Sequence, residues 1–245
     1  MRLTRTKLGP LNCTCVDADM TGAKPKQAVV LCHGVNAPGD DLVGIGEEVL
    51  QLAPQLAKST RFYFPAGLHD SAEFGMPGGR AWWEIDWAGF GQMMQSGDYS
   101  PMYRAHPPGL DKARAALEAC LAAIFAETGL DASRLVLGGF SQGAMLATDT
   151  VLRMKGNPAS LVAFSGSVLC EDEWRKLAPA HKGLRVLQSH GRQDPVLPFA
   201  GGEGLRDLLA QAGAKVEFVP FNGEHGIALE AIQKFAQLLE HEGAK

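Results

Sequence analysis

Residues 135–146 read Leu-Val-Leu-Gly-Gly-Phe-Ser-Gln-Gly-Ala-Met-Leu, and the other motifs of the chain can be placed relative to this stretch. An apolar run ends in a Gly-x-Ser-x-Gly turn, and a second apolar run follows. This order predicts a buried strand, a tight turn and a helix, with the Oγ of Ser141 raised at the end of a sheet. Gly139 and Gly143 suit the turn because strand and helix approach too closely there for a Cβ. A glycine-rich turn carrying an ordinary serine is the alternative, and the flanking runs argue against it.

Length and composition limit the classes of protein that the chain can be. With 245 residues and 46% hydrophobic content, residues 1–245 are expected to form a single α/β domain. A net charge of -4 offers no basic surface, so we expect neither nucleic acid nor an anionic membrane as a partner. No apolar run approaches the roughly 20 residues needed to cross a bilayer. Five scattered cysteines do not resemble a disulfide framework, which predicts a cytoplasmic protein with buried thiols.

Strand-like and helix-like segments alternate along most of the chain. Strands are expected at 11–16, 27–32, 61–64, 135–140, 161–164, 184–190 and 216–220. Helices are expected at 40–58 with a break near Pro54, and at 110–128, 142–154, 201–212 and 227–239. This alternation predicts a mostly parallel central sheet with helices on both faces. Residues 66–108, rich in glycine and proline, are expected to form an irregular loop segment near the active site.

A serine hydroxyl needs a base within hydrogen-bond reach and a group that orients the base. In folds where a serine follows a strand in this way, the acid comes after a later strand and the histidine comes last. Asp194 and His225 occupy those two places. Alone, Asp194 could be a turn residue and His225 a surface loop residue, but the ordered set with Ser141 favours a triad. His33 and His190 end strands before glycine and are interpreted as groups that order loops.

Three further features point to the surroundings of the serine. The backbone N–H of Val35, after the strand that ends at His33, is a candidate oxyanion donor, and a simple strand-to-loop turn is the alternative. A tryptophan cluster at 82–87 is either core packing or the wall of a cleft. Methionines between 88 and 108 suit an adaptable apolar surface. The candidate substrate-binding residues are therefore Trp82, Trp83, Met93 and Met94.

Taken together, these motifs resemble the phospholipase/carboxylesterase family of serine hydrolases, which includes the acyl-protein thioesterases. The resemblance covers about residues 27–239 and rests on five stretches. They are Leu-Cys-His-Gly at 31–34, Gly-Met at 75–76 with Arg-Ala-Trp-Trp-Glu-Ile at 80–85, Leu-Gly-Gly-Phe-Ser-Gln-Gly-Ala at 137–144, His-Gly-Arg-Gln-Asp-Pro-Val-Leu-Pro at 190–198, and Gly-Glu-His at 223–225. Two features depart from the family pattern: Asn36 stands where glycine is usual, and the segment 88–108 is longer and richer in methionine.

The resemblance implies an α/β-hydrolase fold in which Ser141 is the nucleophile and Asp194 and His225 complete the triad. It implies that the amides of Val35 and Gln142 form the oxyanion hole. It also implies that no cofactor or metal is needed, and members of the family often form homodimers. Family substrates are carboxylic esters, lysophospholipids and acyl thioesters.

We therefore expect a carboxylesterase that cleaves small-molecule esters of short to medium acyl chains through an acyl-serine intermediate. An acyl-thioesterase or a lysophospholipase is the alternative within the same chemistry. A non-catalytic relative that binds an apolar ligand is the alternative of another class.

Overall fold

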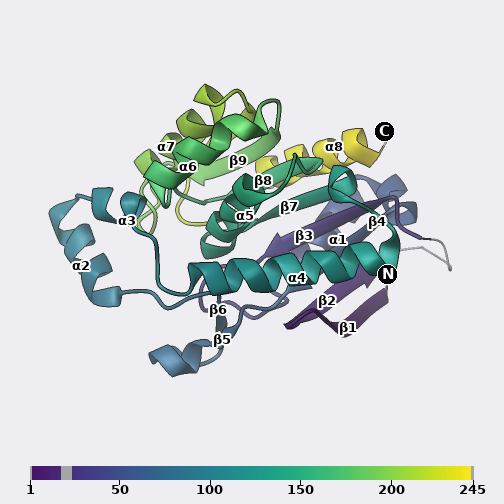
Figure 1. Ribbon diagram of the computed structural model, residues 1–245, viewed down its shortest axis with the longest axis horizontal. Helices are drawn as coiled ribbons and strands as arrows, with labels where there is room; N and C mark the ends of the chain where they lie inside the picture. The colour runs from purple at the N-terminus through teal and green to yellow at the C-terminus, as the bar shows by residue number, and fades with distance from the viewer. Residues whose placement is uncertain (1, 18–23, 244–245) are drawn as a thin grey trace.

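An eight-stranded sheet forms the centre of the protein in the computed structural model, which describes residues 2–17 and 24–243 (Figure 1). The strands are β1 (Arg2–Leu8), β2 (Leu11–Asp17), β3 (Gln27–Cys32), β4 (Thr60–Pro65), β7 (Leu135–Phe140), β8 (Ser160–Phe164), β9 (Arg185–Gly191) and β10 (Lys215–Phe221). Their order is β1-β2-β4-β3-β7-β8-β9-β10. From β4 to β10 all neighbours are parallel, whereas β2 is antiparallel to both β1 and β4. The expected mostly parallel sheet is confirmed.

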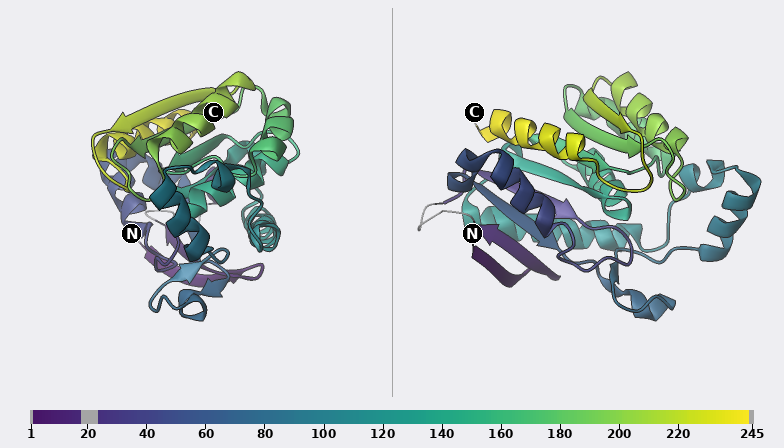
Figure 2. Two further views of the ribbon diagram at one scale, coloured as in Figure 1. Left: turned by 90° about the vertical axis from the view of Figure 1, so that its left-hand side faces the viewer. Right: turned by 180° about the vertical axis from the view of Figure 1, so that it is seen from behind.

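Helices cover both faces of this sheet (Figures 1 and 2). One face carries α4 (Leu110–Thr128), α5 (Gln142–Arg153), α6 (Glu171–Leu177) and α7 (Phe199–Gln211), which share one apolar cluster with the sheet. The other face carries α1 (Val43–Leu52) and α8 (Leu229–Gly243), which belong to a second cluster. Every residue of α5 except Arg153 is buried, so the helix that follows the serine is held rigidly. Short 3₁₀ helices lie at Pro54–Lys58, Ser71–Phe74, Ala132–Arg134 and Ala178–His181.

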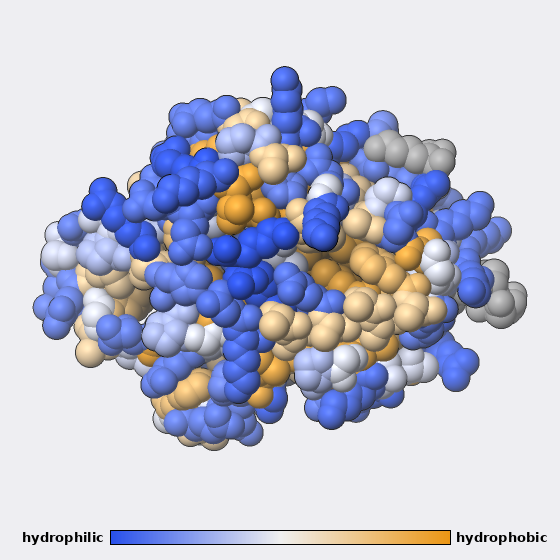
Figure 3. Space-filling view, viewed as in Figure 1, coloured by the Kyte–Doolittle hydropathy of each residue, from blue (hydrophilic) through white to orange (hydrophobic). Residues whose placement is uncertain are grey.

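The face in Figure 3 is mainly hydrophilic, with smaller hydrophobic patches among the charged residues. All five cysteines are free and buried, as the sequence predicts. Within residues 2–17 and 24–243, none of the helices combines the length and the apolar character that crossing a membrane requires.

The first strand, β1, is absent from the sequence-based expectation. It pairs with β2 in a hairpin whose turn contains Gly9 at a φ of 56°. Most of its side chains are exposed because β1 is an edge strand. An exposed edge strand needs no apolar alternation, which is why the pattern of the sequence missed it. The break expected near Pro54 is confirmed, since α1 ends at Leu52 and a 3₁₀ helix begins at Pro54.

The segment 66–108 is more regular than expected. It contains the short strands β5 (His69–Asp70) and β6 (Arg80–Ala81), followed by the helices α2 (Trp87–Ser96) and α3 (Ser100–Arg104). None of the residues in α2 is buried, and glycine and polar residues stand between Trp87, Phe90 and Met93, so their helical spacing is easily missed.

The signals for α2 were its caps. The carboxylate of Asp86 accepts a hydrogen bond from the N–H of Gly89 at the start of the helix, and Gly97 ends it with a φ of 72°. We refer to residues 87–104 as the cap. It projects from the body of the molecule beyond one end of the sheet (Figures 1 and 2).

Candidate active site

Ser141 occupies a strained turn between β7 and α5. Its φ of 54° and ψ of -120° lie outside the ordinary regions for a residue with a side chain. The turn is held because the N–H of Ser141 donates to the carbonyl of Phe164 at 2.9 Å. A Cβ on Gly143 would overlap the backbone carbonyls of Cys32 and His33, and one on Gly139 would also overlap the Cys32 carbonyl. The tight strand-turn-helix predicted from the glycines is confirmed.

Asp194 and His225 come together at the carboxyl ends of β9 and β10. The Nδ1 of His225 lies 2.6 Å from Oδ2 of Asp194. An ionised carboxylate can only accept, so Nδ1 carries the proton and Nε2 presents a lone pair. The His225 ring packs against Phe140, with ring centroids 4.8 Å apart. Phe140 directly precedes Ser141, so the histidine lies beside the turn that holds the serine.

The carboxylate of Asp194 is completely buried yet fully supplied with donors. Its Oδ1 accepts from the N–H groups of Val196 and Leu197 at 2.8 and 2.9 Å. Its Oδ2 faces His225, and also the Nε2 of His190 at 3.3 Å. Burial by itself raises the pKa of Asp194, but hydrogen bonds from His190 and His225 outweigh it and hold that pKa well below the usual range. Asp194 therefore stays ionised at neutral pH.

His190 has a larger part in the site than the sequence suggested. Its Nε2 also donates to the carbonyl of Leu197 at 2.7 Å, as expected for a group that orders a loop. The contact with Asp194 was not expected. The available signal was spacing, since His190 lies in the last two residues of β9, four residues before the aspartate.

The two candidate oxyanion donors lie at the same cavity as the serine. Both Val35 and Gln142 line it. The neighbour Asn36 adopts a φ of 59°, a left-handed conformation that asparagine tolerates better than most residues. Its N–H donates to the carbonyl of Arg80 at 2.8 Å. Asparagine in place of the usual glycine is therefore accommodated in this loop.

Trp82, which the sequence analysis gave as a candidate substrate-binding residue, does not reach the cavity. It is fully buried and is not among the residues that line the cavity. The indole Nε1 of Trp82 donates to the carbonyl of His33 at 3.0 Å, and the backbone N–H of Trp82 donates to the Oε1 of Gln142 at 3.0 Å. The Nε2 of Gln142 in turn donates to the carbonyl of Trp83 at 2.9 Å. Trp82 thus ties the end of β3 to the start of α5 instead of touching the cavity.

The cavity beside Ser141 has a volume of about 660 Å³. It lies between the cap and the body, and its walls are largely apolar. Residues that line it include Trp83, Ile85, Trp87, Phe90, Met93, Met102, Met145, Leu169 and Leu197. This size lies within the range of small-molecule sites. The cluster at 82–87 is therefore partly core and partly cavity wall.

The two methionines predicted to bind substrate, Met93 and Met94, lie in different environments. Met93 lines the cavity, whereas Met94 is 50% exposed and is not part of the lining. Adjacent helical residues point about 100° apart, so they cannot share one wall. The placement of Met94 in the acyl pocket is thereby corrected.

His33 fixes the loop that follows β3 through two hydrogen bonds. The N–H of Gly67 donates to its Nε2 at 2.8 Å, so Nδ1 must carry the proton and donate to the carbonyl of Gly34 at 2.7 Å. Both bonds need the neutral ring. Burial is the main reason that the pKa of His33 falls to about 4.

This shift predicts a pH-dependent stability. The pKa of histidine in an unfolded chain is ~6.5. Below that pH the unfolded chain therefore binds a proton at His33, whereas the folded protein keeps this ring neutral down to lower pH. The free energy of unfolding should therefore fall as pH drops from 6.5 toward 4. We expect urea denaturation to show wild type losing about 2 kcal/mol more than His33→Gln between pH 7 and pH 5. Equal losses in the two proteins would contradict a neutral, buried His33.

Among the residues that the structure describes, no group of three or more His, Cys, Asp or Glu side chains is arranged to hold a metal ion.

Comparison with known proteins shows the family of the chain. The sequence pattern of the phospholipase/carboxylesterase family matches residues 15–241. The chain belongs to this family. It is therefore a hydrolase of the group that contains esterases and thioesterases, and its α/β-hydrolase fold follows from the same match.

Several known proteins are similar to the chain. Acyl-protein thioesterase 1 of Kluyveromyces lactis is 26% identical over 240 residues, which cover 94% of this chain and 97% of that protein. Acyl-protein thioesterase 1 of Neurospora crassa is 32% identical over 117 residues, which cover 46% of this chain and about half of that protein (48%). The crystal structure of esterase PE8 has a TM-score of 0.76 and 28% identity, over 98% of this chain and 99% of that one. A carboxylesterase from Mesorhizobium loti, 17% identical over 97% of this chain and 98% of that one, shares the fold with a TM-score of 0.70.

Proposed function

We propose that this protein is a carboxylesterase that cleaves esters of short to medium acyl chains with Ser141, Asp194 and His225 as its catalytic triad. The observation that carries the proposal is the hydrogen bond of 2.6 Å between His225 and Asp194 beside a serine held in a strained turn. An apolar cavity that reaches this serine supports it.

In the proposed reaction, Nε2 of His225 takes the proton of Ser141 as the Oγ attacks the ester carbonyl. Asp194 holds the ring in the required tautomer and stabilises the imidazolium that forms. The N–H groups of Val35 and Gln142 bind the oxyanion, and the second lies at the N-terminus of α5, where helical amides lack intrahelical partners. Protonated His225 then releases the alcohol. Water activated by the same histidine hydrolyses the acyl-serine.

A fluorophosphonate probe separates this function from ligand binding without catalysis. We expect the probe to modify Ser141, located by mass spectrometry of the digested protein. A panel of p-nitrophenyl esters and matched thioesters then measures the acyl preference and the leaving-group preference. The names of the curated relatives favour the thioesterase alternative, and faster cleavage of thioesters than of esters would select it. Modification of another serine, or no turnover of either series, would reject the proposal.

The wall of the cavity predicts how rate depends on acyl length. Each methylene that enters an apolar pocket contributes about 0.8 kcal/mol, or roughly fourfold in kcat/KM, until the pocket ends. We expect Met93→Ser to flatten this rise from acetate to hexanoate, because a polar side chain replaces part of the wall. Met94→Ser is the matched control, since Met94 is 50% exposed. If both variants keep the wild-type slope, the acyl chain does not lie against α2.

A further inference from the structure

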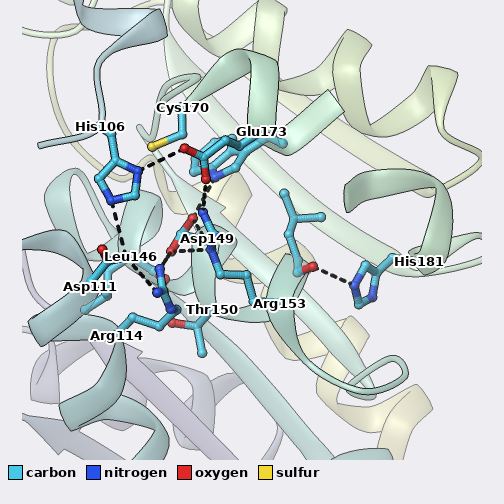
Figure 4. A network of polar contacts seen from close by, with 12 residues as sticks. His106, Asp111, Arg114, Leu146, Asp149, Thr150, Arg153, Cys170, Glu173 and His181 are labelled. Carbon is cyan, nitrogen blue, oxygen red and sulfur yellow. Dashed lines mark hydrogen bonds and ion pairs between the residues drawn. The ribbon is translucent and has the colours of Figure 1, made fainter. Parts of the chain in front are cut away.

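His106 joins the end of the cap to the body of the protein. It lies two residues after the end of α3, and it lines the cavity beside Ser141. Its Nδ1 lies 3.1 Å from a carboxylate oxygen of Glu173 on α6, and its Nε2 lies 3.2 Å from a carboxylate oxygen of Asp111 on α4. Figure 4 shows the ring between these two groups. A second contact between the end of the cap and the body lies next to it, since the N–H and the Sγ of Cys170 both donate to the carbonyl of Ala105.

A charged ring satisfies both contacts, of which the one to Glu173 has hydrogen-bond geometry. A carboxylate oxygen can only accept, so both ring nitrogens must carry a proton for both contacts to be hydrogen bonds. A neutral ring would turn one lone pair toward a carboxylate oxygen and lose that contact.

The charged groups next to these two carboxylates also favour a protonated ring. Asp149 on α5 is completely buried and lies between Arg114 at 2.6 Å and Arg153 at 3.1 Å. The indole of Trp174 also donates to it at 2.9 Å. These two arginines reach the carboxylates that hold the ring, Arg114 to Asp111 at 2.7 Å and Arg153 to Glu173 at 2.6 Å.

The network in Figure 4 therefore contains three carboxylates and two guanidinium groups. Its charges balance when His106 is protonated and leave one uncompensated negative charge when it is neutral. Arg104, two residues earlier at the end of α3, is exposed.

The other titratable groups that contact the ring or its neighbour keep one charge state near neutral pH. The hydrogen bond from Arg114 lowers the pKa of Asp111, and that from Arg153 lowers the pKa of Glu173. Burial raises the pKa of the Cys170 thiol to about 12. Histidine side chains ordinarily change charge between about pH 5 and 8.

We propose that His106 is a positioning residue that fixes the cap over the acyl cavity, and that its protonation makes the preference for longer acyl chains depend on pH. The part that concerns acyl chains rests on the proposed esterase function. An acetyl group occupies little of the cavity near Ser141, whereas a hexanoyl group must lie against the cap. Loss of one contact to the ring should therefore weaken transition-state binding of the hexanoyl ester more than that of the acetyl ester.

The test compares kcat/KM for p-nitrophenyl hexanoate with that for p-nitrophenyl acetate at pH 6 and pH 8.5. Ionisation of the catalytic base affects both substrates equally, so it cancels in the ratio. We expect the wild-type ratio to fall roughly threefold at pH 8.5, the size of effect typical of a partly exposed ion pair. His106→Gln, which has no charge to lose, should show one ratio at both pH values. His69→Gln is the matched control, because His69 also contacts a carboxylate, that of Glu73, but does not line the cavity.

A second measurement does not need turnover. In the Ser141→Ala protein, hydrogen exchange of the 87–106 amides, corrected for intrinsic rates, should be roughly threefold less protected at pH 8.5 than at pH 6. Adding His106→Gln should remove this pH dependence.

A wild-type ratio that does not change with pH, or an equal change in His106→Gln, would overturn the inference while ester cleavage itself stands. If no ester is cleaved, the proposed function fails. Hydrogen exchange that still depends on pH, and loses this dependence in His106→Gln, would then support the role of His106 in fixing the cap. Hydrogen exchange that does not depend on pH through His106 would overturn that role.

Discussion

Ser141→Ala is expected to reduce kcat for ester hydrolysis by a factor on the order of 10⁶, the loss typical when the nucleophile of a serine hydrolase is removed. Alanine keeps the Cβ and the backbone of the turn, whose φ is 54°, so the strain and the packing around it change little. The thermal midpoint should therefore stay close to that of wild type. Fluorophosphonate labelling should disappear together with turnover.

Ser133→Ala provides the control for this variant. Ser133 is exposed and contacts Asp131 in the 3₁₀ turn before β7, and it does not line the cavity. Its replacement should leave both labelling and turnover unchanged. More than a few per cent of wild-type activity in Ser141→Ala, from a preparation free of wild-type enzyme, would show that another group attacks the ester.

The parts of the fold that the sequence predicted are those with dense local signals. Strand β7 and helix α5 follow from an apolar run, a glycine-bounded turn and a second apolar run, all within residues 135–146. Asp194 and His225 could be placed because each directly follows a strand, and parallel strands bring their carboxyl ends to one edge. Local pattern and tertiary structure agree there, so the prediction of their proximity is confirmed.

The parts that the sequence missed lack an apolar period or depend on distant contacts. The cap helix α2 has no buried residue and only a short apolar stripe broken by glycines, and β1 is an exposed edge strand without apolar alternation. Trp82 and Met94 were misplaced for a different reason. Whether an apolar side chain faces a cavity, the core or solvent depends on how its element packs, and composition cannot show this. The carboxylates that hold His106 lie on two other helices, so sequence spacing gave no sign of them.

Asp194→Asn is expected to lower kcat by about 10⁴ with little change in the fold. The amide oxygen of asparagine can still accept from the N–H groups of Val196 and Leu197, which keeps the loop in place. The amide nitrogen would then replace the oxygen that now lies 2.6 Å from Nδ1 of His225. An NH₂ group donates, so His225 would have to accept at Nδ1 and carry its proton on Nε2, where it cannot take the proton of Ser141.

His190 makes the substitution more disruptive than the triad geometry alone suggests. Its Nε2 also faces the replaced oxygen at 3.3 Å, and its donated hydrogen bond helps to keep the pKa of Asp194 low. His190 keeps the Leu197 carbonyl as its acceptor, but one N–H of the new amide would face the His190 N–H in a fully buried place, where an unmatched donor is costly. Asp172→Asn is the control, because Asp172 is an exposed residue of α6 and should tolerate the same change. If kcat instead fell in Asp172→Asn and persisted in Asp194→Asn, the acid of the triad would be misassigned.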